Sequence, residues 1–226
     1  MGQRPALVVF DCDGVLTLNR SSWSLVHRVL GTDNRADLQA FLGDHIDVHE
    51  FIRRDVARWQ SVAPGLTPAR LQDAVSPYMT PMPGAADLIA SLRAVGTTVA
   101  CISGGLDLLV NPLAARLGID QALTFANGLS IHTDWRLAGG GIVRVSPKAK
   151  DLRLRALLEH LQLPPAEVVA IGDTHDDAKM FMQQVRGIAF NSTDERLHAA
   201  AHHVEHRADL RHLAPVLGLP RLPMAP

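Results

Sequence analysis

The chain has 226 residues, with 22 basic and 23 acidic side chains and a net charge of −1. This balance gives no electrostatic basis for binding nucleic acid or an anionic membrane, and no apolar run approaches the roughly 18 residues of a membrane span. The first apolar run, residues 7–10, is also too short for a signal peptide. We therefore expect a cytoplasmic protein with one core domain and an insertion, in which Cys12 and Cys101 stay reduced.

The first predicted element is a buried strand that ends in two carboxylates. Residues 7–10 are all apolar, as expected for a parallel strand covered on both faces, and Asp11 and Asp13 follow directly. Gly14 permits a sharp turn after them. Two carboxylates this close repel unless a cation neutralises them or one keeps its proton. Because ligands bind beyond the carboxyl ends of strands in open α/β sheets, the pair is suited to hold a hard cation and to act as nucleophile and general acid.

The segment that follows this strand changes to a helical pattern. Apolar residues at helical spacing predict three helices, at 22–30, 47–59 and 67–75. The proline-rich run 77–84 then marks a boundary. We therefore predict a helical cap formed by residues 15–80, which lies over the site, and a core formed by residues 1–14 and 81–226.

After the boundary, helices and strands alternate, which favours a mostly parallel sheet. The apolar strand 99–102 is followed by Ser103, Gly104 and Gly105. A serine hydroxyl can donate to an anion, and glycines let backbone N–H groups approach it closely. The start of the next helix also favours negative charge. This strand end is therefore a predicted phosphate site.

The remaining polar segments add a lysine and more carboxylates. A helix predicted at 147–161 carries Lys150 near its start, and the apolar strand 168–171 is followed by Asp173 and Asp177. Carboxylate oxygens suit a hard cation such as Mg²⁺, and a lysine suits developing negative charge on a phosphate. The strand ends and the lysine together predict a metal-assisted phosphate site.

Several alternatives remain open in the second half of the chain. Lys148 competes with Lys150, and Asp176 competes with Asp177. The glycines at 139–141 predict the turn of a β-hairpin rather than a phosphate loop. A zinc site is an alternative to a last edge strand at 204–209, because histidines are frequent there: His198, His202, His203 and His206.

The order D-x-D-G, S-G-G, lysine and G-D-x-x-x-D resembles the haloacid dehalogenase superfamily and, within it, the phosphoserine phosphatase-like branch. The resemblance implies an α/β fold with a Rossmann-like, mostly parallel sheet and a helical cap after the first strand. It also implies a Mg²⁺-dependent phosphatase that acts on a small phosphorylated metabolite. Lys150 lies 23 residues before Asp173, which is the family's usual spacing, and Asp177 completes the last motif.

The resemblance also implies a role for each motif residue. Asp11 would attack phosphorus and form an aspartyl-phosphate, while Asp13 would protonate the leaving alkoxide and later activate water. The phosphate would be held by Ser103, Gly104, Gly105 and Lys150. The metal would be held by Asp11, Asp13, Asp173 and Asp177. Asp13 would contribute its backbone carbonyl, and Asp177 would orient either Lys150 or the water shell of the metal.

The substrate residues depart from the family pattern. Arg20 stands where phosphoserine phosphatases carry a glutamate for the substrate's amino group, and Asp55 stands where they carry an arginine for its carboxylate. Asp55 falls on the apolar face of its helix, so it must be paired or functional. Either Arg20 and Asp55 pair with each other, or both face the substrate; Arg53 or Arg54 would replace the arginine if the register differs by a residue. We expect phosphoserine to be a poor substrate. A phosphomutase or phosphotransferase on the same core, or a non-catalytic binding protein, are the alternatives.

Overall fold

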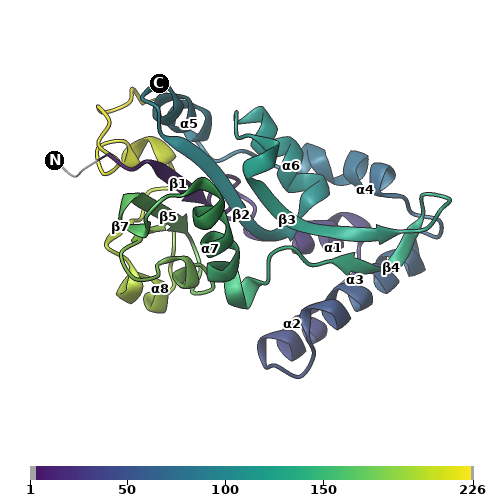
Figure 1. Cartoon of the computed structure of the whole chain (residues 1–226). Coiled ribbons are helices and arrows are strands. Elements are labelled where there is room, and N and C mark those ends of the chain that lie inside the picture. The colour runs from purple at the N-terminus through teal and green to yellow at the C-terminus, as the bar shows by residue number, and fades with distance from the viewer. Residues whose placement is uncertain (1–3, 225–226) are drawn as a thin grey trace.

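The computed structural model describes residues 4–224. Their strands form one seven-stranded sheet in the order β4-β3-β2-β1-β5-β6-β7 (Figure 1). The strands are β1 (Leu7–Phe10), β2 (Thr98–Leu106), β3 (Thr124–Ile131), β4 (Leu137–Ile142), β5 (Val168–Gly172), β6 (Arg186–Phe190) and β7 (His203–Glu205). Neighbouring strands are parallel except β3 and β4. The predicted mostly parallel sheet is confirmed.

Helices cover both faces of the sheet. They are α1 (Ser22–Leu30), α2 (Arg35–Leu42), α3 (Val48–Val62), α4 (Pro68–Val75), α5 (Ala85–Ala94), α6 (Asp107–Arg116), α7 (Lys150–Leu161) and α8 (Glu195–Ala200). Val8 and Phe10 pack with the apolar residues of α5 and α6, whereas Leu7 and Val9 pack with those of α7. Alternate strand residues face opposite sides, so a strand covered on both sides must be apolar throughout.

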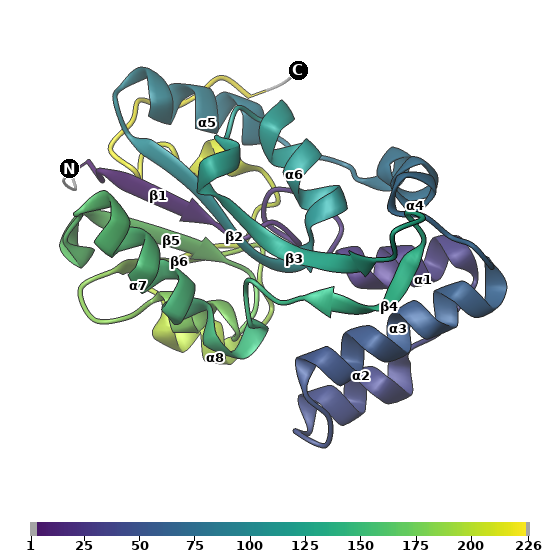
Figure 2. The same ribbon diagram turned by 45° about the vertical axis from the view of Figure 1, so that its right-hand side comes forward.

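Helices α1 to α4 lie beyond the carboxyl end of β1, at the end of the molecule away from the chain termini (Figure 2). Three of them, α1, α3 and α4, match the predicted helices. Asp47 caps α3 by accepting from Glu50 N at 2.8 Å, and Thr67 caps α4 by accepting from Arg70 N at 3.2 Å. The helix α2 was not predicted, because only Asp37 and Phe41 are buried in it. A helix with so little buried surface leaves little apolar periodicity.

The chain enters and leaves this helical segment at one place. Leu18 N donates to Thr80 O at 2.9 Å, and Met82 N donates to Leu16 O at 2.9 Å. The Thr17 hydroxyl also donates to Thr80 O at 2.7 Å. The two connections therefore lie side by side, at residues 16–18 and 80–82.

The β-hairpin is present, but its predicted turn is wrong. The turn lies at 132–136, where His132 N donates to Arg136 O at 2.8 Å. The glycines at 139–141 lie within β4, against helix α3. A Cβ atom at Gly141 would lie 2.7 Å from Ile52 Cγ2. Close packing of a helix on the strand, rather than a turn, therefore explains why glycine occupies this position.

The C-terminal histidines do not gather into a metal site. β7 is an edge strand parallel to β6, as one of the two alternatives predicted. His202 Nδ1 accepts from Gly187 N at 3.1 Å, and the rings of His198 and His206 lie edge to face 5.5 Å apart. Within residues 4–224, the one group of side chains arranged to hold a metal ion is Asp11, Asp173 and Asp177. No helix in the same range is long and apolar enough to cross a membrane.

Candidate active site

The predicted site residues meet at the carboxyl ends of three adjacent strands. β1 lies between β2 and β5 in the sheet, so the ends that carry Asp11, Ser103 and Asp173 are neighbours. Lys150, at the start of α7, joins them. These four residues are at most 5% exposed. The sequence therefore folds its motifs into one buried cluster.

Three carboxylates crowd together in this cluster. One oxygen from each of Asp11, Asp173 and Asp177 lies within 4.8 Å of the others. Burial raises the pKa of Asp11 well above its usual range, although the nearby Lys150 opposes this. Burial, together with the charge of Asp177, raises the pKa of Asp173 to about 7. The site therefore holds more negative charge than one lysine balances, which favours binding of a cation.

Lys150 is the lysine that reaches the carboxylates. Its Nζ lies 2.6 Å from Asp177 Oδ1 and 3.1 Å from Asp11 Oδ1. Burial alone would lower the pKa of Lys150, but Asp11 and Asp177 raise it above its ordinary value, so the side chain is charged. Lys148 instead contacts helix α2 and the loop after it, through Asp44 and the carbonyl of Phe41. The structure thus places Lys150, and not Lys148, in the cluster.

Asp177 holds the lysine and its own loop in place. Besides the contact with Lys150, its Oδ2 accepts from the backbone N–H groups of Asp173 and Thr174, each at 3.0 Å. Both carboxylate oxygens are therefore engaged. Asp176 lies nearby on the wall of the adjacent cavity.

Asp13 is held by a residue that sequence reasoning missed. Its Oδ2 accepts from Ser22 N at 2.7 Å and from the Ser22 hydroxyl at 2.8 Å. Burial raises the pKa of Asp13, while these two bonds lower it. Ser22 is the first residue of α1, and the N–H groups of a first helical turn are free to bind a carboxylate. The predicted helix start at residue 22 was therefore the signal that could have indicated this contact. A Cβ atom at Gly105 would lie 2.5 Å from Ser22 Oγ and 2.9 Å from Asp13 Oδ2, so this approach requires glycine.

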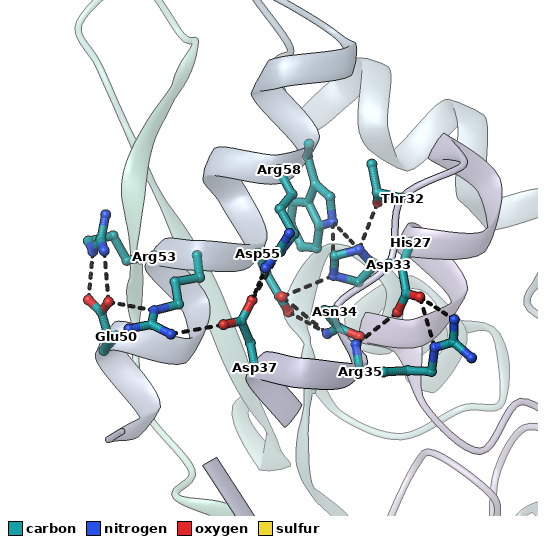
Figure 3. Close-up of polar contacts among 12 residues, drawn as sticks. His27, Thr32, Asp33, Asn34, Arg35, Asp37, Glu50, Arg53, Asp55 and Arg58 are labelled. Carbon is teal, nitrogen blue, oxygen red and sulfur yellow. Dashed lines mark hydrogen bonds and ion pairs between the residues drawn. The ribbon is translucent and has the colours of Figure 1, made fainter. Parts of the chain in front are cut away.

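Arg20 and Asp55 do not pair with each other, so the first of the two alternatives for them is wrong. Arg20 Nη1 lies 3.2 Å from Asp173 Oδ2, and its Nη2 donates to Asn191 O at 2.9 Å. Asp55 is fully buried. It lies 3.0 Å from His27 Nε2 and accepts from Asn34 Nδ2 at 3.1 Å (Figure 3). Helix periodicity placed Asp55 on the inner face of α3, but could not show that His27 and Asn34 would occupy its carboxylate.

Asp55 also does not reach the substrate side. It does not line the cavity described below, and neither do Arg53 and Arg54. Arg53 donates to Glu50, and Arg54 donates to Glu50 and Asp37. The expectation that Asp55 faces the substrate is therefore corrected, and neither arginine replaces it. Of the two substrate residues predicted in the cap, Arg20 alone lies on the cavity wall.

The carboxylates open into a cavity of about 250 Å³ between the sheet and helices α1 to α3. On the sheet side it is lined by Asp11, Asp13, Ser103, Gly104, Gly105, Asn127, Pro147, Lys150, Thr174 and Asp176. On the helical side it is lined by Arg20, Ser21, Trp23, Ser24, Asn34, Leu38, Phe41, Leu42, Val48, Phe51 and Ile52. A reacting group beside Asp11 would therefore have the rest of its molecule against the helices.

A parallel sheet that presents two aspartates, a serine and a buried lysine beneath inserted helices defines an enzyme of phosphoryl transfer. The family model of haloacid dehalogenase-like hydrolases matches residues 8–182, and the chain belongs to this family. The phosphoserine phosphatase of Idiomarina loihiensis is 32% identical over 85% of this chain and 84% of its own length. The phosphoserine phosphatase of Methanocaldococcus jannaschii is 29% identical over 84% of this chain and 87% of its own length.

Solved structures agree with this assignment. A phospho-aspartyl intermediate analogue of phosphoserine phosphatase has a TM-score of 0.77 and 26% identity, over 95% of this chain and 100% of its own. A substrate-bound phosphoserine phosphatase complex has a TM-score of 0.77 and 25% identity, over 96% of this chain and 100% of its own. The predicted family, fold class and phosphatase activity are thereby confirmed.

Proposed function

We propose that this phosphatase depends on Mg²⁺ and hydrolyses a small phosphomonoester through an aspartyl-phosphate on Asp11. The observation that carries the proposal is the convergence of Asp11, Asp13 and Lys150 on one wall of the cavity. The likeness to a phospho-aspartyl intermediate analogue of phosphoserine phosphatase supports the same chemistry.

The residues present fit a magnesium ion. Mg²⁺ prefers oxygen ligands and keeps several waters, and the cluster offers buried carboxylate oxygens. Asp11 Oδ1 has no hydrogen-bond partner, although Lys150 lies near it. Asp11, Asp173 and the backbone carbonyl of Asp13 would hold the ion, which would offset the negative charge of the carboxylates and the phosphate. Because both oxygens of Asp177 already accept hydrogen bonds, we assign it to positioning Lys150.

The side chains then divide the reaction between them. An oxygen of Asp11 forms a bond to phosphorus while the bond from phosphorus to the ester oxygen breaks. Asp13 gives its proton to that leaving oxygen, for which its raised pKa suits it. It then takes a proton from the water that hydrolyses the aspartyl-phosphate. Ser103 and Lys150 contact the phosphate oxygens, where negative charge gathers in the transition state.

We propose that phosphoserine is a poor substrate of this enzyme, although the relatives carry that name. Recognition of phosphoserine needs a cation for its carboxylate and an anion for its amino group. Asp55, Arg53 and Arg54 all lie away from the cavity, and Arg20 is engaged by Asp173 and Asn191. The helical side of the cavity therefore offers no free ion pair for a zwitterion.

Phosphate release from a panel of small phosphate esters with Mg²⁺ tests the proposal, with Asp11→Asn as the inactive control. We expect turnover of some esters and weak turnover of L-phosphoserine. A kcat/KM for L-phosphoserine above about 10⁴ M⁻¹s⁻¹, in the normal range for a natural substrate, and well above every competitor would show that the specificity proposal is wrong.

A further inference from the structure

We propose that the cavity takes a phosphomonoester whose organic part is uncharged and apolar except for one hydroxyl group, which donates a hydrogen bond to Asn34. This inference rests on the proposed phosphatase function and deepens it. The cavity volume of about 250 Å³ lies below the roughly 300 Å³ at which typical ligand pockets begin. The substrate is therefore a small molecule.

The helical wall of the cavity is apolar and aromatic. The rings of Phe41 and Phe51 stack with centroids 5.2 Å apart, and the ring centroids of Phe51 and Trp23 lie 6.4 Å apart. The polar atom of Trp23 is already used, because Nε1 donates to Gly104 O at 3.0 Å. Leu38, Leu42, Val48 and Ile52 complete this wall. This wall therefore favours the binding of an organic group that needs no polar partner.

Asn127, another polar side chain on the cavity wall, is already engaged. Asn127 accepts from Arg144 N and Val145 N, and donates to the carbonyls of Gly104 and Val145. These four bonds fill its capacity. Ser21 Oγ accepts from Ser24 N at the start of α1. The Asn127 amide therefore cannot recognise a substrate without losing a bond, whereas the Ser21 hydroxyl still has a proton to donate.

Asn34 differs, because its amide is oriented and one end is free. Its Nδ2 donates to both oxygens of Asp55, at 3.1 Å each. A carboxylate only accepts, so the NH₂ group must face Asp55 and the carbonyl oxygen is left to the cavity that Asn34 lines. Asp55 is fixed in turn by His27, whose Nδ1 lies 2.7 Å from the Thr32 hydroxyl (Figure 3). Asp55 is therefore a positioning residue, and Asn34 Oδ1 accepts from the substrate.

Charge on the cavity wall, outside the catalytic residues, is confined to two loops. Arg20 is paired with Asp173. Asp176 lies in the loop after β5, on the sheet side, 3.6 Å from His175 Nε2. Helices α2 and α3 present no charged side chain to the cavity. An ammonium or carboxylate on the leaving group would lie unpaired against their apolar surface, which is strongly unfavourable.

Kinetics of the wild-type enzyme test the substrate class. We expect kcat/KM to rise about fourfold per methylene along the series methyl to butyl phosphate, from the roughly 0.8 kcal/mol of each buried CH₂. We expect 2-phenylethyl phosphate to exceed both L-phosphoserine and phosphoethanolamine by at least about 100-fold. A charged ester that outperforms its apolar counterpart would overturn the inference and leave the phosphatase intact. Absence of Mg²⁺-dependent turnover with every ester would instead overturn the proposed function, and this inference with it.

Hydroxylated 2-phenylethyl phosphates, with the hydroxyl at each ring position in turn, test the role of Asn34. The best of them should exceed the parent by up to about tenfold, the value of one net hydrogen bond. In Asn34→Leu and in Asp55→Asn, which no longer dictates the amide orientation, the ratio of kcat/KM for the best hydroxylated ester to kcat/KM for the parent should fall to about one, and this ratio is compared within each variant. Gln39→Ala, at an exposed position on α2, the helix that follows Asn34, should keep the preference, and circular dichroism verifies folding. If wild type shows no hydroxyl preference, or a folded Asn34→Leu retains it, the role of Asn34 is refuted.

Discussion

Replacement of Ser22 by alanine isolates the positioning of the general acid. Ser22 is fully buried. Its backbone N–H and its hydroxyl both donate to Asp13 Oδ2, at 2.7 and 2.8 Å, and the hydroxyl also accepts from Leu106 N at 3.0 Å. Ser22→Ala keeps the backbone bond and removes the other two. Asp13 then keeps one of the two donors that fix its carboxylate.

The size of the effect follows from the charge of the acceptor. A hydrogen bond to a charged group contributes about 1.5–3 kcal/mol, which corresponds to about 10- to 150-fold in rate if it acts fully in the transition state. Loss of the hydroxyl also lets burial raise the pKa of Asp13 further, because the Ser22 bonds now lower it. We therefore expect kcat/KM for an alkyl phosphate to fall by about 10- to 100-fold.

The choice of leaving group separates this effect from general damage. An alkoxide must be protonated as it leaves, whereas p-nitrophenolate is stable without a proton, so kcat/KM for p-nitrophenyl phosphate should fall less than about threefold. Ser91→Ala is the matched control, because that hydroxyl donates to Asp87 O within α5, outside the cavity. Equal losses on both substrates, or no loss on either, would refute the positioning role of Ser22.

Three further predictions concern the nucleophile, the metal and the cap. Asp11→Asn should abolish phosphate release and Asp13→Asn should slow it by about 10²–10⁴; turnover retained in Asp11→Asn contradicts a covalent intermediate. EDTA should abolish activity and excess Ca²⁺ should inhibit, because calcium takes more ligands in a looser geometry; full activity in EDTA excludes the metal. Burial would raise the pKa of Asp37, but hydrogen bonds from Arg54 and Arg58 outweigh it and lower that pKa. The ionised Asp37 carboxylate therefore stabilises the fold fully above the pKa that it has in the unfolded chain. This stabilisation is lost as the pH falls through the lower pKa that it has in the folded protein. In urea unfolding, Asp37→Asn should be about 1–3 kcal/mol less stable at pH 7, and the gap should close below about pH 4; a gap that does not change with pH contradicts this.

Local patterns sufficed where a residue's role depends on its neighbours in the chain. The all-apolar run of β1 predicted a strand buried on both faces, and Asp11 and Asp13 followed at its end because the carboxyl edge of a parallel sheet is where ligands bind. Helices α1, α3 and α4 were predicted from their apolar spacing. Each of these features can be predicted from a short continuous stretch of the sequence.

The remaining features depend on partners from distant segments. The glycines of β4 indicated a turn, whereas the contact that requires glycine comes from Ile52 on α3. Asp55 was recognised as an inward-facing carboxylate, but its partner His27 lies on another helix. Ser22 carried no motif of its own, because its role exists only where the first turn of α1 meets Asp13. The spacing of residues along one helix predicts the direction in which a side chain points. It does not identify the residue of another segment that the side chain contacts.

The side-by-side connections at 16–18 and 80–82 have a consequence for exchanging modules within this family. Because the ends of the insertion already touch, a segment of different length can be grafted between them with little loop-closure cost. However, α1 carries both Ser22, which fixes the acid, and Trp23, which donates to the backbone of Gly104. A chimaera that keeps the native rate constants for bond breaking must therefore retain the chain through Gly31, and the portion that can be transplanted to alter selectivity begins with α2.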